Sequence, residues 1–309
     1  QPVKGSFMGY EIISMGPPSS GGLLVVHMLN MLEKIIEEKN SDFDLSFNSV
    51  NYIHTLTELE RRAYADRTEH MADSDYWNVP NSMFLSHDYA HERLKDIDFK
   101  KATDSQLVEH GNPYSNQSEE TTHYSIIDSE GNAVSVTTTI NSGYGNGITV
   151  TGAGFLLNNE MDDFSSKPGE PNMFGLLGNE ANAIEAKKRP LSSMTPTIVL
   201  KDGSPFLILG SPGGSTIITT VMQNILNVIV HNMNIQEAVS SPRVHSQWLP
   251  DMVFHEKNGL SPEIIDELKK MGHDVRMRGS IGEANGIMIN EKGFWGGPDS
   301  RGENTAIGY

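Results

Sequence analysis

The stretch that most constrains the fold of this chain runs from Thr121 to Asn141. Apolar and polar residues alternate through His123–Asp128 and again through Ala133–Ile140, and the polar run Ser129–Asn132 separates the two segments. Alternation with a period of two is typical of strands that bury one face, and a short turn between two such runs favours a β-hairpin. The stretch therefore predicts a pair of antiparallel strands.

The segment before this hairpin has the opposite character. Asn112–Glu120 shows no apolar periodicity and is typical of an exposed linker. Thr121 and Thr122 thus stand where a linker meets a strand. On these residues alone the simplest interpretation is structural, because β-branched residues favour strands.

Length, charge and cysteine content exclude several classes of protein. The 309 residues allow one large domain or two ordinary ones, and 37% hydrophobic residues suffice for a core. A formal net charge of −17 argues against sequence-independent binding to nucleic acid or to an anionic membrane. The chain has no cysteine, which excludes disulfides, thiolate nucleophiles and cysteine-ligated metals.

Neither end of the chain nor its apolar runs predict a membrane segment. The longest apolar runs, Gly22–Leu32 and Ile217–Val230, are too short or too polar to span a bilayer. The chain starts at Gln1 without a signal peptide, so we expect a processed or truncated product.

The remaining pattern predicts a mixture of helices and strands. Strands are expected at Phe7–Met15, Thr149–Leu157, Thr197–Leu200, Pro205–Leu209 and Ala284–Gly293, and a loop at Trp295–Arg301. Helices are expected after the cap residues Ser19 or Ser20, at Ser49–Asp73, around His87, and at Thr216–His231, Asn234–Ser240 and Ser261–Met271. Hairpins followed by helices indicate an α+β or α/β arrangement in layers.

Two clusters of polar residues are assigned to the surface. The helix at Ser49–Asp73 carries a dense group of charges, interpreted as a solvated, salt-bridged face: Glu58, Glu60, Arg61, Arg62, Asp66, Arg67 and Glu69. His87 and His91 have the i, i+4 spacing of a zinc motif, but no glutamate follows His87 and no third ligand is evident. We therefore predict a surface helix there.

The run GSPGGS at Gly210–Ser215 carries the strongest local chemistry. It follows a predicted strand and opens a long helix, so its backbone N–H groups can form an anion site. The spacing is neither that of a phosphate-binding Walker loop nor that of the hydrolase elbow. Two interpretations stay open: an oxyanion hole, or a tight turn that needs glycine for steric reasons.

Several motifs, taken together and in order, resemble the γ-glutamyltranspeptidases. They are GYEIISMGPPSSGG (9–22), AYADR (63–67), TTHYSIID (121–128), GNAVSV (131–136), LLNNEMDDFS (156–165), KRPLSSMTPT (188–197), GSPGGS (210–215), PRVH (242–245) and QWLP (247–250). The resemblance implies an α+β, N-terminal nucleophile hydrolase fold, a four-layer αββα sandwich, here lacking the usual N-terminal part of the large subunit. It implies one structural domain, with 1–120 from a large subunit and 121–309 as the small subunit.

The same resemblance assigns the nucleophile. It implies that the precursor cuts itself between Glu120 and Thr121, and that Thr121 then attacks substrate with its own α-amine as base. An α-amine has a reference pKa of about 7.7–8.0, so it is partly neutral at physiological pH. Thr139 matches a threonine whose hydroxyl contacts the nucleophile, and His123 is expected to have a structural role.

Further positions follow from the same family pattern. Asn141, Glu160 and Asp163 match positions that hold the substrate α-amino group, Ser192 and Ser193 match donors to its α-carboxylate, and Gly213 and Gly214 match the oxyanion hole. Lys167–Gly178 resembles a lid loop, and Phe174 stands where some members carry a gating tyrosine. An arginine that clamps the carboxylate belongs to the upstream part of the large subunit, which this chain lacks.

The resemblance implies a γ-glutamyltransferase and glutathione hydrolase that needs no cofactor or metal. The expected partners are glutathione or another γ-glutamyl amide, an amino acid or peptide acceptor or water, and the missing large-subunit segment, at a secreted or periplasmic location; no nucleic acid or membrane is expected. Within the fold, glutaryl-cephalosporin acylases and poly-γ-glutamate depolymerases are alternatives. From a different class, an uncleaved, non-catalytic binding fragment is the other alternative.

Overall fold

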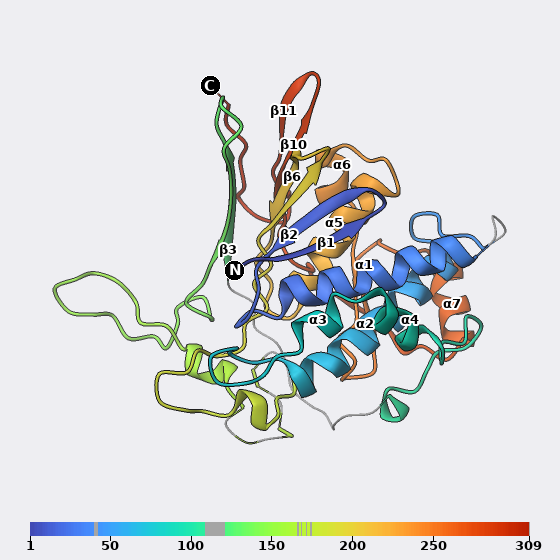
Figure 1. The fold of residues 1–309 in the computed structure, drawn as a ribbon, viewed down its shortest axis with the longest axis horizontal. Helices are drawn as coiled ribbons and strands as arrows, with labels where there is room; N and C mark the ends of the chain where they lie inside the picture. Colours follow the sequence, from blue (N-terminus) through green and yellow to red (C-terminus); the bar gives the residue numbers. More distant parts are fainter. Residues whose placement is uncertain are drawn as a thin grey trace.

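The computed structural model describes residues 1–39, 43–108, 121–165, 167, 169–170, 172–173 and 175–308. The predicted linker beyond residue 112, Glu120 and Phe174 lie outside these described residues. The secondary structure is a mixture of helices and strands, as the sequence predicts (Figure 1).

The elements follow one another along the whole chain. The helices are α1 (Gly21–Glu38), α2 (Val50–His70), α3 (Asn81–Phe84), α4 (His87–Leu94), α5 (Thr216–Ile229), α6 (Ile235–Ser240) and α7 (Pro262–Lys270), with 3-10 turns η1 (Ser105–Leu107), η2 (Glu160–Asp163) and η3 (Glu180–Asn182). The strands are β1 (Val3–Phe7), β2 (Tyr10–Ser14), β3 (Thr122–Ile127), β4 (Ala133–Thr138), β5 (Thr197–Lys201), β6 (Ser204–Gly210), β7 (Val244–His245), β8 (Val253–Glu256), β9 (Val275–Arg278), β10 (Asn285–Asn290) and β11 (Gly293–Gly297).

A six-stranded antiparallel sheet forms the centre of the molecule. Its strand order is β1-β2-β5-β6-β10-β11. The first hairpin of the chain enters this sheet because Glu11–Ser14 pair with Thr197–Leu200. Residues on both sides of the predicted cleavage point therefore share one sheet and one apolar core. The division of the chain at Glu120–Thr121 stays a prediction.

Helices α1 and α5 pack beneath this sheet. Side chains are buried continuously from Gly21 to Leu32 in α1 and from Thr216 to Val228 in α5. A helix whose side chains are buried on all sides must be covered by neighbouring elements on all sides. Accordingly, α1 contacts β1 and β2 on one side and α2, α4 and α5 on the others (Figure 1).

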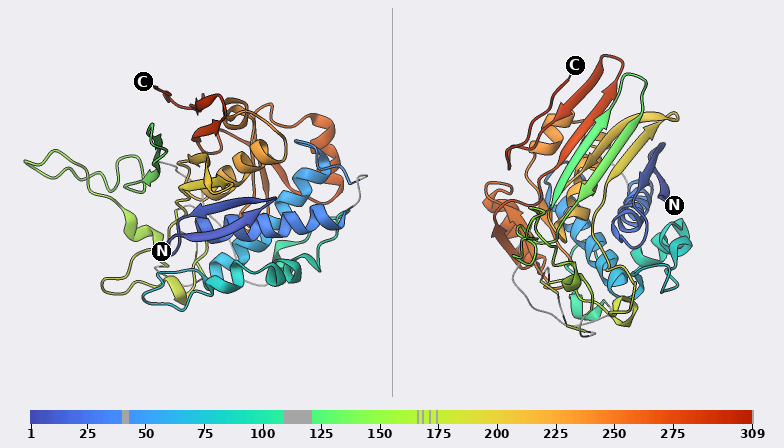
Figure 2. Two further views of the ribbon diagram at one scale, coloured as in Figure 1. Left: turned by 45° about the horizontal axis from the view of Figure 1, so that its top comes forward. Right: turned by 90° about the vertical axis from the view of Figure 1, so that its left-hand side faces the viewer.

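The hairpin β3–β4 lies along the opposite face of the sheet, next to β6 and β10 (Figure 2). Its register runs from Thr122 opposite Thr138 to Ile127 opposite Ala133. His123 is buried against the sheet, whereas Tyr124 and Ile126 point away from it and are 46% and 50% exposed. The face that the hairpin turns outward is thus apolar. The outer helical layer of the predicted sandwich is not found in the part of the chain that the structure describes.

Two predicted elements differ from the structure. The strand Thr149–Leu157 is wrong, since only Thr149 and Leu156 pair, as an isolated bridge in a loop that projects from the body (Figure 1). A projecting segment has no third strand to pair with and no face to bury. The loop predicted at Trp295–Arg301 is wrong at its start, because residues up to Gly297 belong to β11, which pairs with β10. Glycine has a low strand propensity, so the sequence did not indicate this strand.

Helix α2 corrects a third prediction. Most of its charges are buried rather than solvated: Glu58, Glu60, Arg61, Arg62, Asp66 and Arg67. Glu58 accepts from Arg62 Nη1 at 2.6 Å and from the backbone N–H of Thr103 at 3.0 Å. The pattern of charges predicted ion pairs, but periodicity alone does not show which neighbouring segments cover a helix. By contrast, His87 and His91 are exposed on α4, which confirms the predicted surface helix.

In the part of the chain that the structure describes, no helix is both long enough and apolar enough to cross a bilayer.

The buried ion pair of Glu58 leads to a stability prediction. Glu58→Gln should lower the free energy of unfolding by about 3 kcal/mol, because it removes the buried carboxylate that pairs with Arg62 Nη1 and leaves that buried guanidinium only the exposed carboxylate of Asp96. Urea unfolding measures this change. Glu92→Gln is the matched control, since Glu92 pairs with Lys95 at the surface and should cost about 0.5 kcal/mol or less. Equal losses in the two variants would contradict the assignment.

Candidate active site

A small cleft gathers side chains from segments that are far apart in the sequence. Its walls come from α2, from both ends of the β3–β4 hairpin where it enters the body, from η2 and the loop after it, from the segment before β5 and from the start of α5. The lining residues are Arg67, Thr121, Thr139, Asn141, Asp163, Asn172, Leu176, Leu191, Ser192, Ser193, Met194, Gly214 and Ile217. Most of the predicted site residues therefore meet in one place.

The hairpin register brings two hydroxyl groups together. Because Thr122 lies opposite Thr138, the next residues outward, Thr121 and Thr139, are also opposite one another. Thr121 Oγ1 donates to Thr139 Oγ1 at 3.2 Å. Thr139 Oγ1 also accepts from the backbone N–H of Asn141 at 2.8 Å, which fixes its position.

Asn141 turns the chain at the end of β4. Its φ of 75° lies in the left-handed region, which asparagine tolerates better than most residues. The residue is buried, and its Nδ2 donates to the backbone oxygen of Asn159 at 3.3 Å. A strained, polar and buried residue at a cleft is typical of a functional position.

The Gly210–Ser215 loop meets the cleft at the start of α5. Gly213 and Gly214 have φ values of 134° and 53°, and a Cβ on Gly213 would lie 2.4 Å from Thr216 Oγ1. The backbone angles and the lack of space for a Cβ therefore agree with a tight turn that needs glycine for steric reasons. The N–H groups of Gly213 and Gly214 have no hydrogen-bond partner within the described residues. Unpaired donors at a helix N-terminus are also what an oxyanion hole requires.

Asp163 is the most perturbed acid of the cleft. Burial raises its pKa to about 7, the negative charge of Glu160 adds to this shift, and Arg67 opposes it. Its Oδ1 has no partner among the described groups. A carboxyl group in this state gains most from a cationic ligand. Glu160 itself opens η2 beside Asp163 but does not line the cleft.

Ser192 and Ser193 also line the cleft. The Ser192 backbone oxygen accepts from the N–H and the hydroxyl of Ser20, at 3.0 and 2.9 Å. Ser193 Oγ accepts from Arg67 Nη2 at 3.2 Å. Sequence reasoning missed Arg67, which it placed on a solvated face. The AYADR motif, recognised only as part of the resemblance, was the signal that marked this residue.

A family model for gamma-glutamyltranspeptidase matches residues 1–309, the whole chain. This chain belongs to the gamma-glutamyltranspeptidase family.

Among its curated relatives, the glutathione hydrolase proenzyme of Escherichia coli strain K12 is 44% identical over 310 residues, and that of Bacillus subtilis strain 168 is 36% identical over 326 residues. Each match covers 100% of this chain and 52% of the relative, so the chain spans about half the length of the curated relatives it matches.

Solved structures agree with the family assignment. A mutant of Helicobacter pylori gamma-glutamyltranspeptidase is 59% identical, with a TM-score of 0.57, over 59% of this chain and 100% of that chain. A cephalosporin acylase from Bacillus halodurans covers 100% of this chain and 53% of its own, with a TM-score of 0.81; at 22% identity it shows the fold alone. The predicted α+β, N-terminal nucleophile hydrolase fold is confirmed.

The predicted lid segment, Lys167–Gly178, is described only in part. Asn172 and Leu176 line the cleft, and Met173 Sδ accepts from Asn159 Nδ2 at 3.4 Å. The lid role of Lys167–Gly178 stays a prediction, and so does the gating role of Phe174, which is outside the described residues.

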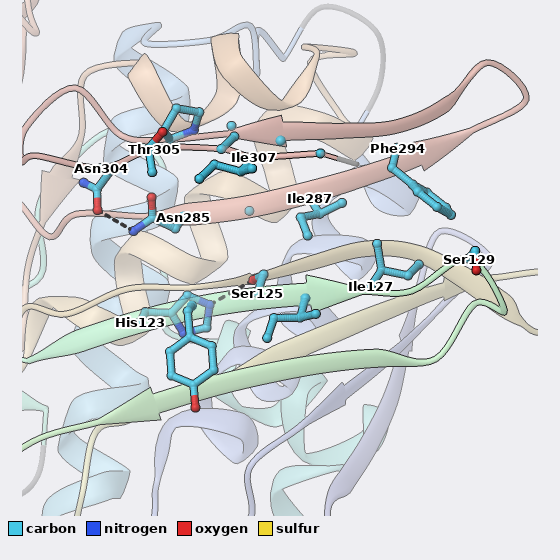
Figure 3. Close-up of a pocket in the computed structure, with 18 residues that line it drawn as sticks. His123, Ser125, Ile127, Ser129, Asn285, Ile287, Phe294, Asn304, Thr305 and Ile307 are labelled. Atoms are coloured by element: carbon cyan, nitrogen blue, oxygen red, sulfur yellow. Dashed lines mark hydrogen bonds between the residues drawn. The ribbon is translucent and has the colours of Figure 1, made fainter.

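A larger cavity, of about 630 Å³, lies elsewhere, between β3, β10, β11 and residues 304–308 (Figure 3). His123 and Ser125 point into it from β3, and His123 Nε2 lies 3.1 Å from Ser125 Oγ. Burial lowers the pKa of His123 to about 4, which makes it a weak base, and its Nδ1 pairs with Thr137 rather than with an acid. The smaller cleft is therefore the better candidate for catalysis.

The charges around Asp163 lead to a titration prediction. Glu160→Gln should lower the pKa of Asp163 below about 7, because it removes a neighbouring negative charge that raises this pKa. Carboxyl ¹³C NMR measures the shift. Glu180→Gln is the control, since Glu180 is exposed at the start of η3 and should leave the Asp163 titration unchanged. A rise in the pKa of Asp163 in Glu160→Gln would contradict this account of the cleft.

Proposed function

We propose that this chain carries the catalytic centre of a γ-glutamyltransferase and glutathione hydrolase, with Thr121 as nucleophile. The hydrogen bond between Thr121 and Thr139, in a cleft that also holds Gly214, Asp163 and Ser193, is the observation that carries the proposal. Family membership supports the same activity. Secretion or a periplasmic location belongs to the proposal too.

Maturation is the first reaction. Thr121 Oγ attacks the carbonyl carbon of Glu120, the C–N bond of that peptide breaks, and the nitrogen takes up a proton. Water then hydrolyses the resulting ester and frees the carboxyl group of Glu120. The products are a carboxylate and a new α-amine on Thr121, beside the hydroxyl that it can deprotonate.

Turnover uses the same hydroxyl. The amine accepts its proton while Oγ attacks the γ-carbonyl carbon of the substrate, and Gly213 and Gly214 N–H groups stabilise the oxyanion. Collapse of the tetrahedral intermediate breaks the amide bond, and the leaving amine takes the proton. Water or an acceptor amine then attacks the γ-glutamyl ester and regenerates Thr121.

The cleft offers groups that suit both charges of an α-amino acid head group. Asp163, Asn141 and nearby Glu160 provide acceptors for the ammonium, and Ser192 and Ser193 provide hydroxyl donors for the carboxylate. The substrate class is therefore γ-glutamyl amides, glutathione among them.

The segment missing relative to the longer relatives is the proposed protein partner. Tyr124, Ile126 and Val134 form an apolar outer face on the hairpin and are 46%, 50% and 46% exposed. A sheet face of this kind is stable in water when another layer covers it. We assign this cover to the upstream part of the large subunit.

Autocleavage provides the direct test of the proposed nucleophile. Thr121→Ala in the complete precursor should leave one uncut polypeptide without γ-glutamyl hydrolysis, because the attacking hydroxyl is absent. Intact mass and a chromogenic γ-glutamyl anilide measure the two effects. Thr122→Ala, an exposed neighbour, should still be cleaved. A cut Thr121→Ala protein would falsify the assignment, and an uncut wild-type protein would favour the non-catalytic alternative.

Acylases are the alternative within the fold, since the acylase ACY 1 proenzyme of Pseudomonas sp. strain SE83 is 34% identical over 297 residues. A γ-glutamyl anilide should be hydrolysed about 10- to 100-fold faster (kcat/KM) than a glutaryl anilide, which lacks the ammonium, because a charged hydrogen bond contributes about 1.5–3 kcal/mol. Asp163→Asn should reduce this preference. Equal rates on both anilides would support an acylase instead.

A further inference from the structure

Arg67 is a buried cation in the wall of the cleft. It lies in the last turn of α2, and only 3% of the residue is exposed. The other fully buried arginines each pair with a carboxylate: Arg61 with Asp251, Arg62 with Glu58 and Arg243 with Asp299. Within the described residues, Arg67 has no carboxylate at ion-pair distance. Burial lowers its pKa to about 10, which leaves it charged at neutral pH.

A buried guanidinium without a counterion costs free energy unless an anion reaches it. Arg67 donates to hydroxyl groups instead: Nε to Ser20 Oγ at 2.9 Å and Nη2 to Ser193 Oγ at 3.2 Å. Asp163 lines the same cleft and acts on Arg67 through its charge, but it makes no ion pair with it. The guanidinium charge is thus balanced only in part within the described residues.

These contacts also orient the two hydroxyl protons. A guanidinium has donors only, so each serine must direct its own proton away from Arg67. Ser20 Oγ donates to the Ser192 backbone oxygen at 2.9 Å and ties that residue to the start of α1. The Ser193 proton is directed away from Arg67, and Ser193 lines the cleft. The Arg67 guanidinium therefore fixes Ser20 and, through it, the Ser192 backbone. It also leaves the Ser193 hydroxyl proton available to donate to an anion in the cleft.

The same interaction explains a local departure from the predicted helix start. Ser20 occupies the N-cap position of α1, but its side chain makes no capping hydrogen bond. Capping by serine contributes about 1 kcal/mol. The hydroxyl is instead committed to Arg67 and Ser192, which indicates that the position of this loop takes precedence over helix capping.

We propose that Arg67 is a positioning residue for the α-carboxylate of the γ-glutamyl substrate, acting through the Ser193 hydroxyl and, by way of Ser20, through the Ser192 backbone. This inference rests on the proposed function and assigns a carboxylate partner that lies within this chain. Asp163 lines the same cleft and is the proposed partner of the substrate ammonium, so the two charges would recognise a zwitterion.

The test compares two substrates that differ only at the carboxylate. A γ-glutamyl anilide carries it, and a 4-aminobutyryl anilide has the same ammonium and amide without it. In the complete, processed enzyme, Arg67→Gln should lower kcat/KM for the γ-glutamyl anilide at least tenfold, mainly through KM. For the 4-aminobutyryl anilide the change should stay within about twofold. Arg67→Lys should restore part of the γ-glutamyl activity.

Inhibition constants of free glutamate and 4-aminobutyrate provide the same comparison without turnover. Arg93→Gln is the matched control, because Arg93 pairs with Asp66 on another side of α2 and should leave the ratio between the two ligands unchanged. Equal losses on both ligands in Arg67→Gln, or no loss on either, would overturn the proposal.

Two further measurements separate other causes. If Arg67→Gln fails to fold or to cut itself, Ser20→Ala removes the Nε contact and the Ser20–Ser192 side-chain hydrogen bond but keeps the contact between Arg67 and Ser193. It should change the ligand ratio in the same direction by a smaller factor; an unchanged ratio there counts against the proposal. A wild-type enzyme that is inactive on the γ-glutamyl anilide would instead refute the proposed function.

Discussion

The contact between the β3–β4 hairpin and the central sheet is the constraint on which the site depends. Pairing of Thr122 with Thr138 places Thr121 and Thr139 opposite one another at the end of the hairpin. β6, which the hairpin contacts, ends at the Gly210–Ser215 loop. Because a slip of one residue turns every side chain to the other face, the same register buries His123 and brings both hydroxyl groups to the cleft.

Helix α2 supports the cleft from below through buried polar contacts. Tyr64 donates to the backbone oxygen of Ser215, next to the glycine pair, and Arg67 contacts Ser20 and Ser193 one turn later. The Gly210–Ser215 loop and Ser193 are thus attached to one helix. Preorganised donors of this kind are what acyl transfer needs, since they stabilise charge without reorganisation during the reaction.

Much of the fold was predictable because its signals are local. Alternation predicted β3 and β4, and long apolar runs with caps predicted α1 and α5. The Gly-rich strand β11 and the short strands of the second sheet, β7, β8 and β9, were missed, because pairing partners rather than propensity decide such strands. The strand predicted at Thr149–Leu157 is absent because its residues have a suitable pattern but pair with no neighbouring strand beyond one isolated bridge.

By itself, the sequence determined the family, the helices and strands with strong periodicity, and most of the residues that line the cleft. These features could be predicted because motifs and amphipathic patterns involve residues that are close together in the sequence. Only the tertiary structure decided which charges are buried. The pattern of α2 looks the same whether water or protein covers it, and packing by segments far along the chain made Arg67 part of the cleft. The burial of a side chain depends on the segments that pack against it, and these segments come from distant parts of the sequence.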